Sequence, residues 1–180
     1  MSDIALLPQV KAFLGRHHAL FIDGHALESQ SGQTLDVINP ATGQVIAQVG
    51  TASPGDIDAA VASSRRGFKQ WSQAAPAVRG QVLLKLADLL EQHREELAQI
   101  ETCQSGKIIH ISRAFEVDQA AHFLRYYAGW ATKIGGQTIT PSLPSFAGER
   151  YTAFTLREPC LLYTSPSPRD ATLSRMPSSA

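Results

Sequence analysis

The sequence predicts a mainly helical chain that begins with short β-hairpins and ends with a strand. Turn-forming residues divide the apolar runs between residues 19 and 50, which is typical of short strands. Apolar residues then recur at three- and four-residue steps as far as residue 134, which indicates amphipathic helices. Residues 148–159 are rich in β-branched and aromatic side chains, which favour a strand.

Short strands joined by turns are expected first. Asp23-Gly24 is a pair typical of two-residue hairpin loops, and NPATG at 39–43 places turn formers between two apolar runs. Pro40 also drives Asn39 towards an extended backbone. Residues 1–18 are interpreted as a short amphipathic lead-in, because charged residues interrupt their apolar part.

A first long helix is predicted to begin at Pro54. Ser53 can act as its N-cap, Pro54 suits the first helical position, and Asp56 is placed for a capping box. The residues that follow at helical spacing form a mostly apolar face, which consists of Ile57, Val61, Ser64, Phe68 and Trp71.

Two further helical stretches follow. One begins at Pro76 and is expected to stop near Gly106. Its predicted buried stripe consists of Leu83, Leu86 and Leu90. The other is expected to end at Gly135-Gly136, and its apolar repeat consists of Val117, Ala120, Leu124, Tyr127, Ala131 and Ile134.

Charge and cysteine content narrow the classes of function. The chain of 180 residues has 16 basic and 16 acidic side chains, which are interspersed, so it carries no electrostatic footprint for nucleic acid. Cys103 and Cys160 have no CxxC companion and cannot build a disulfide framework. We therefore expect a reducing, cytoplasmic setting, and no apolar run is long enough to predict a membrane span.

The last residues, 160–180, differ in character from the rest. CLLYTSPSPRD at 160–170 and SRMPSSA at 174–180 can be encoded by the two ends of a transposase-type sequencing adapter, and residues 171–173 leave room for an in-frame index. We therefore expect residues 160–180 to be a translated adapter, which forms a non-native, disordered tail. The alternative is a native flexible Ser/Pro tail.

Residues 19–159 carry an ordered set of motifs, which are FIDG, INPATGQVIAQV, DIDAAVASSRRGFKQW, RGQVLLKLADLLEQHREELAQIET, GK, FLRYYAGWATKIGGQTI and REP. In this order and spacing, the motifs resemble the N-terminal part of the aldehyde dehydrogenase superfamily. EQHREELAQIET and ISRAFEV look most like bacterial phenylacetaldehyde dehydrogenases. The resemblance implies an α/β fold with a Rossmann-like domain in the full-length protein. Residues 19–147 would begin the dinucleotide-binding domain, and residues 148–159 would begin a bridging strand used in oligomerisation.

The resemblance also implies an NAD- or NADP-dependent enzyme that oxidises an aldehyde to its carboxylic acid through a cysteine thioester, with subunits that assemble as dimers or tetramers. A Cys nucleophile, a Glu that activates water and an oxyanion Asn perform this chemistry. In the family, REP continues into a strand and a Pro-Trp-Asn stretch, so all three residues would lie beyond Pro159. We expect this chain to hold no catalytic, cofactor-binding or metal-binding residue and to be inactive alone.

Two alternatives remain open at this point. The chain could be a non-enzymatic small helical interaction protein. It could also belong to a dehydrogenase of the betaine, aliphatic or semialdehyde type, because substrate-lining residues are mostly beyond this segment.

Reactive residue types within the chain are given structural interpretations. Cys103 occupies a helix-end segment with no nearby histidine pattern to activate it. Gly135-Gly136 follows a helix and does not link a strand to a helix, so a C-cap is favoured over a nucleotide loop. The aromatic group Tyr126, Tyr127 and Trp130 falls at core spacing and is interpreted as packing.

The remaining titratable residues are interpreted as surface or capping groups. No metal-ligand spacing relates the six histidines, which are His17, His18, His25, His93, His110 and His122. Glu95, Glu96 and Glu149 are interpreted as solvated face residues. In the isolated chain we expect residues 148–159 to be an unpaired strand edge and the apolar helix faces to be exposed.

Overall fold

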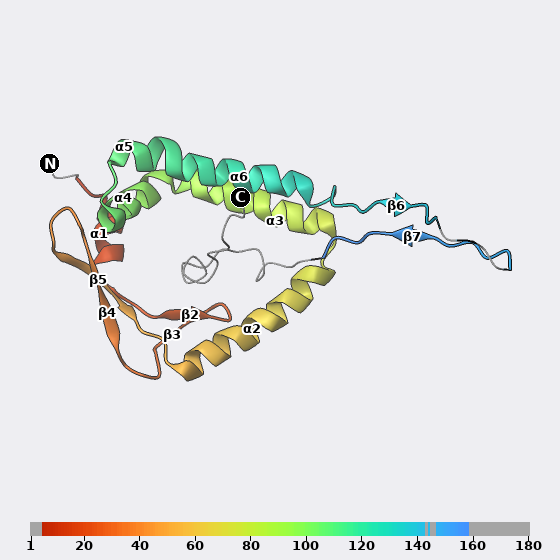
Figure 1. Cartoon of the computed structure of the whole chain (residues 1–180). Coiled ribbons are helices and arrows are strands. Elements are labelled where there is room, and N and C mark those ends of the chain that lie inside the picture. Colours follow the sequence, from red (N-terminus) through yellow and green to blue (C-terminus); the bar gives the residue numbers. More distant parts are fainter. Residues whose placement is uncertain (1–4, 143, 145–146, 159–180) are drawn as a thin grey trace, which may run out of the picture. The chain divides into compact units, whose positions relative to one another are not determined.

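A computed structural model of the chain describes residues 5–142, 144 and 147–158. The chain divides into two compact units, and the division falls between Thr132 and Lys133. The first unit contains every helix and strands β1 to β5, and the second contains β6 and β7 (Figure 1). The predicted adapter tail at 160–180 lies outside the described residues.

The described chain begins with a short helix, α1 (Pro8–Leu14), in the region interpreted as a lead-in. Pro8 stands at its first position, where the missing N–H leaves no helical hydrogen bond unmade. Val10 and Leu14 are buried. A helix of seven residues is too short to be stable alone, so α1 depends on the surface against which it packs.

A hairpin follows, as the sequence predicts. β2 (Leu20–Ile22) and β3 (His25–Leu27) pair antiparallel around Asp23-Gly24. Asp23 and Gly24 have φ of 55° and 80°. Two consecutive residues with positive φ are what a type I′ turn requires, and this turn matches the twist of the two strands.

A three-stranded sheet has β5 (Val45–Gly50) at its centre. β5 pairs in parallel with β1 (His17–His18) and antiparallel with β4 (Thr34–Ile38). The predicted turn between β4 and β5 is present: the Oδ1 atom of Asn39 accepts a hydrogen bond from the backbone N–H of Ala41 at 2.9 Å. This is the Asx turn that favours asparagine at such positions.

The helix α2 (Pro54–Gln73) begins where the sequence predicts. The backbone N–H of Asp56 donates to Ser53 Oγ at 3.2 Å, and the N–H of Ser53 donates to the Asp56 carboxylate at 2.8 Å. The predicted capping box is therefore confirmed. The four large apolar side chains of the predicted face are 42–56% exposed, namely Ile57, Val61, Phe68 and Trp71.

The helical stretch predicted from Pro76 to Gly106 is divided into two helices. α3 (Pro76–Gln92) and α4 (Arg94–Ser105) meet at His93, which has φ −100° and ψ 19° and interrupts the helical geometry. The predicted stop is confirmed, because Gly106 takes the left-handed conformation with φ 74° directly after α4.

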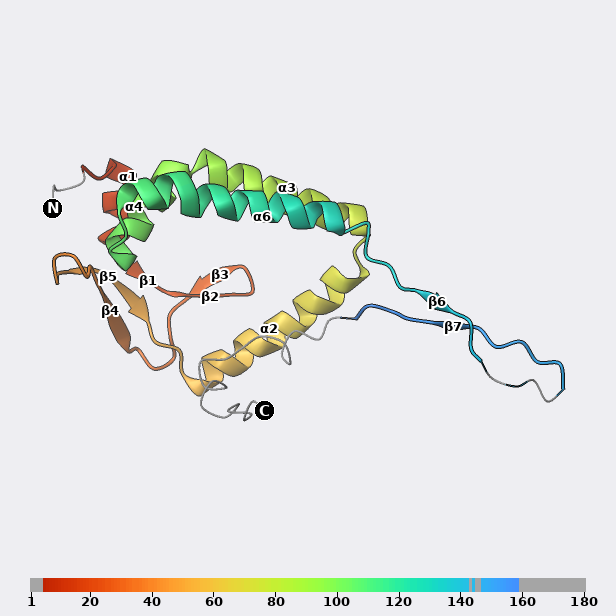
Figure 2. The same cartoon turned by 45° about the horizontal axis from the view of Figure 1, so that its top comes forward.

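α3 and α6 (Val117–Trp130) lie side by side (Figures 1 and 2) and meet through small side chains. Gly80 and Ala87 of α3 are buried, as are Ala121 and Ala128 of α6. A Cβ added at Gly80 would lie 3.1 Å from the carbonyl oxygen of Ala128. The two backbones therefore approach closely at this glycine.

This seam of small residues overturns part of the predicted core. Leu86, which the sequence places in the buried stripe, is 43% exposed. Tyr126 and Tyr127 are each 59% exposed and Trp130 is 46% exposed, so the interpretation of these rings as core packing is wrong. Because the helices touch through glycine and alanine, the larger side chains lie outside the contact.

The segment before α6 was not predicted in this form. It consists of α5 (Ile109–Ile111) and a five-residue π-helix, η1 (Ser112–Glu116), which runs directly into α6. α6 ends at Trp130 with Ala131 as its C-cap, so the predicted end at Gly135-Gly136 is wrong. Among the described helices, none combines the length and apolar character that a membrane crossing requires.

The second unit is a short antiparallel ribbon of β6 (Thr138–Ile139) and β7 (Ala153–Phe154). β6 was not predicted, and its pairing with β7 contradicts the expectation of a wholly unpaired edge at 148–159. A Cβ added at Gly136 would overlap the carbonyl oxygen of Thr155. Gly136 therefore serves the close approach of the two strand segments and does not cap α6.

Candidate functional site

Cys103 lies near the end of α4 and is 8% exposed. It forms one buried apolar cluster of the first unit together with Val10 and Leu14 of α1. Burial raises the pKa of the Cys103 thiol. A nucleophilic cysteine requires a lowered pKa and access, so this geometry supports the interpretation of Cys103 as a packing residue.

Three histidines make local polar contacts. The His17 ring lies 3.0 Å from a Glu28 carboxylate oxygen, the His18 ring 3.0 Å from the carbonyl oxygen of Phe13, and His93 Nδ1 3.2 Å from Glu96. Within the described part of the chain, no three His, Cys, Asp or Glu side chains are grouped so as to hold a metal ion.

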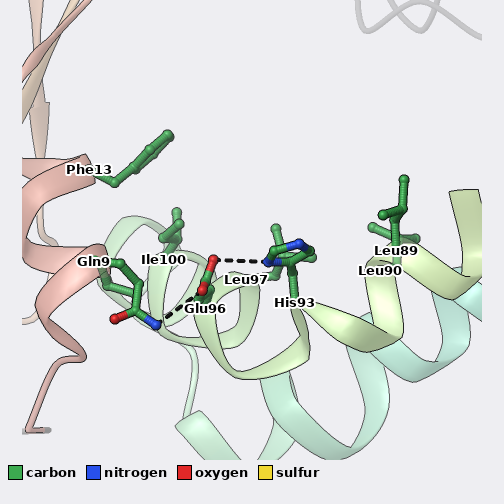
Figure 3. A pocket seen from close by; sticks show the side chains of 9 residues that line it. Gln9, Phe13, Leu89, Leu90, His93, Glu96, Leu97 and Ile100 are labelled. Atoms are coloured by element: carbon green, nitrogen blue, oxygen red, sulfur yellow. Dashed lines mark hydrogen bonds and ion pairs between the residues drawn. The ribbon is translucent and has the colours of Figure 1, made fainter.

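A groove of about 360 Å³ lies between α1 and the junction of α3 with α4 (Figure 3). Glu96 is at its polar side: Gln9 Nε2 donates to one carboxylate oxygen at 3.1 Å, and the His93 ring contacts the other. These hydrogen bonds, from Gln9 first, lower the pKa of Glu96. The rest of the lining is apolar and consists of Val10, Phe13, Leu89, Leu90, Leu97 and Ile100.

Glu95 and Glu96 keep part of their surface in water, as the sequence indicates, but both also have hydrogen-bond partners that the sequence does not indicate. Both are half-buried, and Glu95 binds Arg113 of η1, whose Nη2 donates to it at 2.7 Å. Hydrogen bonding from Arg113 is the main cause of the lowered pKa of Glu95. Glu95 also accepts from Gln99 Nε2 at 2.8 Å. The helical period places Gln99 one turn from Glu95, but it cannot indicate a partner eighteen residues away.

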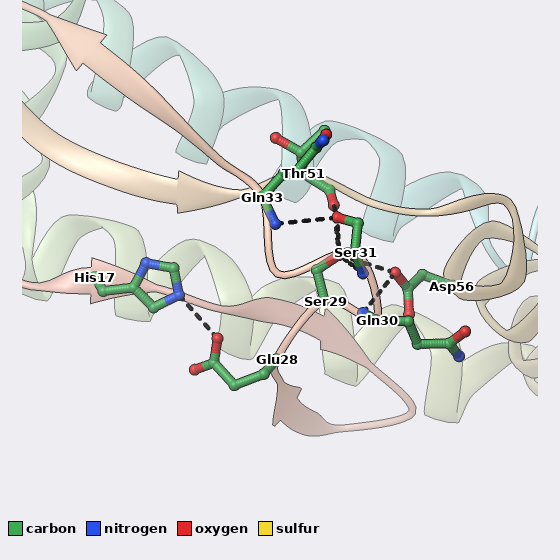
Figure 4. Close-up of polar contacts among 8 residues, drawn as sticks. All are labelled: His17, Glu28, Ser29, Gln30, Ser31, Gln33, Thr51 and Asp56. Atoms are coloured by element: carbon green, nitrogen blue, oxygen red, sulfur yellow. Dashed lines mark hydrogen bonds and ion pairs between the residues drawn. The ribbon is translucent and has the colours of Figure 1, made fainter.

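A second polar cluster is centred on Asp56, which is 5% exposed (Figure 4). Besides the Ser53 N–H, its carboxylate accepts from Ser29 Oγ at 3.1 Å and from the Gln30 N–H at 3.2 Å. The backbone hydrogen bond from Ser53 is the largest cause of the lowered pKa of Asp56. The capping residue found from the sequence therefore also anchors the loop after β3.

Arg125 of α6 links the two long helices through charge. Its Nη2 donates to Asp88 at 2.7 Å and to Glu91 at 2.8 Å, both on α3. The hydrogen bond to Glu91 raises the pKa of Arg125 and lowers that of Glu91. These contacts fix the rotation of α6 against α3 beside the seam of small residues.

Large apolar side chains are exposed in both units, as the sequence analysis expects for the helix faces. In the first unit they include the face of α2 and Phe123 of α6, which is 54% exposed. In the second unit, Tyr151 is 48%, Phe154 63% and Leu156 73% exposed. Exposed apolar groups gathered in this way are typical of surfaces that contact another part of a protein.

Comparison with known proteins identifies relatives of this chain. A sequence profile of the aldehyde dehydrogenase family matches residues 27–164. Phenylacetaldehyde dehydrogenase of Pseudomonas fluorescens is 42% identical over 144 residues, which cover 79% of this chain and 29% of the relative. Aldehyde dehydrogenase family 2 member B4, mitochondrial, of Arabidopsis thaliana is 41% identical over 145 residues, with 79% and 26% covered.

A solved structure shows the same arrangement. The NAD⁺ complex of an aldehyde dehydrogenase from Bacillus cereus is 43% identical and superimposes with a TM-score of 0.74, over 78% of this chain and 29% of that one. The chain thus spans less than a third of the length of these relatives.

Proposed function

Because this chain belongs to the aldehyde dehydrogenase family, we propose that it is the N-terminal part of an NAD- or NADP-dependent enzyme that oxidises an aldehyde to its carboxylic acid. One observation carries the proposal: four-fifths of the chain aligns with phenylacetaldehyde dehydrogenase at 42% identity but occupies 29% of its length. The alignment supports the family activity, and the coverage supports a larger parent protein.

The chemistry of this reaction belongs to the parent protein in our proposal. A thiolate would attack the aldehyde carbon, and a Glu would activate water against the thioester that remains after oxidation. The Cys103 thiol is covered and burial raises its pKa, so the geometry favours a nucleophile elsewhere. We place that Cys, together with the Glu and the oxyanion Asn, in parent sequence after Pro159.

The cofactor is also assigned to the parent. A relative of this fold binds NAD⁺, which supports a nicotinamide cofactor. The Gly135-Gly136 pair does not fit its phosphates: Gly136 lies against the backbone of Thr155, in a ribbon and not at a junction of strand and helix. The described residues therefore form part of the scaffold in this proposal.

We assign two surfaces of the chain an architectural role. The exposed apolar helix faces would pack against the rest of the dinucleotide-binding domain, which would remove them from water. The β6–β7 ribbon would join a subunit interface of a homo-oligomer, because its strands still offer backbone groups for pairing. The proposed setting is cytoplasmic.

The substrate class that we propose is an aromatic aldehyde such as phenylacetaldehyde. Its support is the similarity to the Pseudomonas enzyme of that name.

The test begins with the source DNA. We would read the coding strand past the codon for Pro159 from a downstream primer and express the complete frame. The purified parent would be assayed for production of NADH and NADPH with phenylacetaldehyde, betaine aldehyde, an aliphatic aldehyde and a semialdehyde. The 180-residue chain serves as the control, for which we expect no turnover.

The outcomes separate the parts of the proposal. Turnover of phenylacetaldehyde above the other aldehydes supports the full proposal, and preference for another aldehyde contradicts only the substrate class. A stop codon after a genomic copy of residues 160–180 would refute both the larger parent and the adapter origin of the tail.

A further inference from the structure

We propose that α1 is a detachable strap over the core of the first unit, that Gln99 holds its N-terminal end, and that its docking controls access to the thiol of Cys103. α1 precedes the family match, which begins at residue 27, so the proposed enzyme function gives this helix no role. The inference is therefore independent of that function.

The apolar side of the strap is small and local. Val10 is 1% exposed and Leu14 is 8% exposed, and both contact Cys103 in one cluster. The residues that pack partly buried against the same cluster are Leu6, Leu7, Ile46 of β5 and Ile100. Among the described residues of this cluster, the only buried neighbours of the thiol are Val10 and Leu14, and both belong to α1.

The main polar contact of the strap is a hydrogen bond to a buried amide. The backbone N–H of Leu7, directly before α1, donates to Gln99 Oε1 at 2.9 Å. Gln99 is 3% exposed, so its amide oxygen would lose its partner if the strap detached. Gln9 adds an exposed contact to Glu96 at 3.1 Å.

Gln99 is itself held in place from the opposite side. Its Nε2 donates to Glu95 at 2.8 Å, and Glu95 is bound by the Arg113 guanidinium of η1. The chain of contacts therefore runs from η1 through two side chains of α4 to the start of α1. Because Gln99 and Cys103 are one helical turn apart, the amide that holds α1 and the thiol that α1 covers lie on the same side of α4.

The thiol gives a direct readout of docking. With α1 in place, Cys103 is covered and its pKa is raised, so it reacts slowly with alkylating reagents. With α1 detached, the same thiol faces solvent while α3 and α6 remain paired. Alkylation of Cys103 under native conditions therefore measures the population of the open strap.

The decisive variant is Leu7→Pro. Leu7 has φ −59° and ψ 146°, which proline adopts without strain even before Pro8, so the substitution removes the N–H that Gln99 receives. Leu7→Ala is the matched control, because it removes the side chain and keeps the N–H. We expect Leu7→Pro to accelerate alkylation of Cys103 about tenfold over Leu7→Ala.

Gln99→Met is a second test of the same hydrogen bond. It removes the acceptor of the Leu7 N–H, so it should accelerate alkylation as well. Adding Leu7→Pro to Gln99→Met should then have little further effect. Non-additivity is the signature of two changes that act through one contact. The measurement uses the intact 180-residue chain with N-ethylmaleimide, and mass spectrometry of the tryptic peptide containing Cys103 distinguishes it from the peptide containing Cys160.

Urea dependence distinguishes a strap from complete unfolding. A detached strap exposes little surface, so low urea should change the alkylation rate much less than it changes the global unfolding equilibrium. The proposal is overturned if urea changes alkylation and global unfolding to the same extent, or if Leu7→Pro and Leu7→Ala react equally fast. It is also overturned if the unsubstituted 180-residue chain already reacts as fast as an unfolded peptide.

Discussion

Gly80 and Gly67 show how the surroundings of a glycine decide the effect of one added methyl group. Gly80 lies in the seam between α3 and α6, with the Ala128 carbonyl oxygen 3.1 Å from the position of an added Cβ, whereas nothing lies within 4 Å of that position at Gly67 in α2. Gly80→Ala should lower the free energy of unfolding by about 1 kcal/mol, because overpacking exceeds the gain in helix propensity.

Gly67→Ala is the matched control and should raise the free energy of unfolding by about 0.5–1 kcal/mol, because it gains helix propensity without a clash. Urea unfolding of both variants followed by circular dichroism tests the pair. Equal stabilisation by both substitutions would show that the helices have room at Gly80.

Asp56 predicts a pH dependence with a definite sign. Its pKa is lowered in the folded chain, chiefly by the Ser53 N–H, so folding favours the ionised carboxylate. This contribution is complete above the usual pKa of an aspartate and is lost as the pH falls through the lowered value. The unsubstituted 180-residue chain should therefore have a higher Tm than Asp56→Asn at neutral pH, and this difference in Tm should shrink in acid.

The exposed Asp58 on the same helical turn supplies the control for this titration. Asp58→Asn should leave the pH profile of Tm close to that of the unsubstituted chain. If the Tm of Asp56→Asn stays a constant amount below that of the unsubstituted chain down to strong acid, the role of the carboxylate is contradicted.

Residue roles could be predicted where partners are close in sequence. The Ser53–Asp56 capping box lies within one turn, and local spacing is sufficient to find it. The link from Leu7 to Gln99 spans 92 residues, so no local pattern indicates it.

Gly106 determines how one element ends. It has φ 74°, and a Cβ there would lie 2.9 Å from Pro40 Cγ in the turn between β4 and β5. Gly43 has a similar φ of 71° but open space around its position. Both alanine variants pay the left-handed strain of about 1–2 kcal/mol, and Gly106→Ala should lose clearly more in thermal unfolding because it also displaces Pro40.

The difference between these two variants isolates the contact between α4 and the turn. Equal losses would mean that Pro40 moves away freely and that this contact contributes nothing to stability.

Element boundaries followed the sequence where a residue with a special backbone role marks them. Asp23-Gly24, Pro54 and Gly106 each did so. The break at His93 and the π-helix at Ser112–Glu116 have no such marker in the sequence, because ordinary residues form both. The prediction of the buried stripe of α3 was wrong at Leu86 because it followed hydrophobicity, which ranks leucine above glycine and alanine. The helices meet through these smaller residues instead.

Self-association is predicted for the molecule as a whole. Exposed apolar side chains and a ribbon of only two strands favour association in water, so the 180-residue chain should sediment above its monomer mass. Phe154→Ser combined with Leu156→Ser should shift sedimentation towards the monomer, whereas Thr152→Ser on the same segment should not. Sedimentation of the unsubstituted chain at its monomer mass would contradict this prediction.

The contact between Leu7 and Gln99 also orders events during synthesis. α1 leaves the ribosome before α4, and its binding surface on α4 is made some ninety residues later. Until then its apolar residues have no native partner, and a helix of seven residues does not persist by itself. α1 therefore reaches its native place only after α4 has been translated, and during that interval its apolar side chains are open to chaperones.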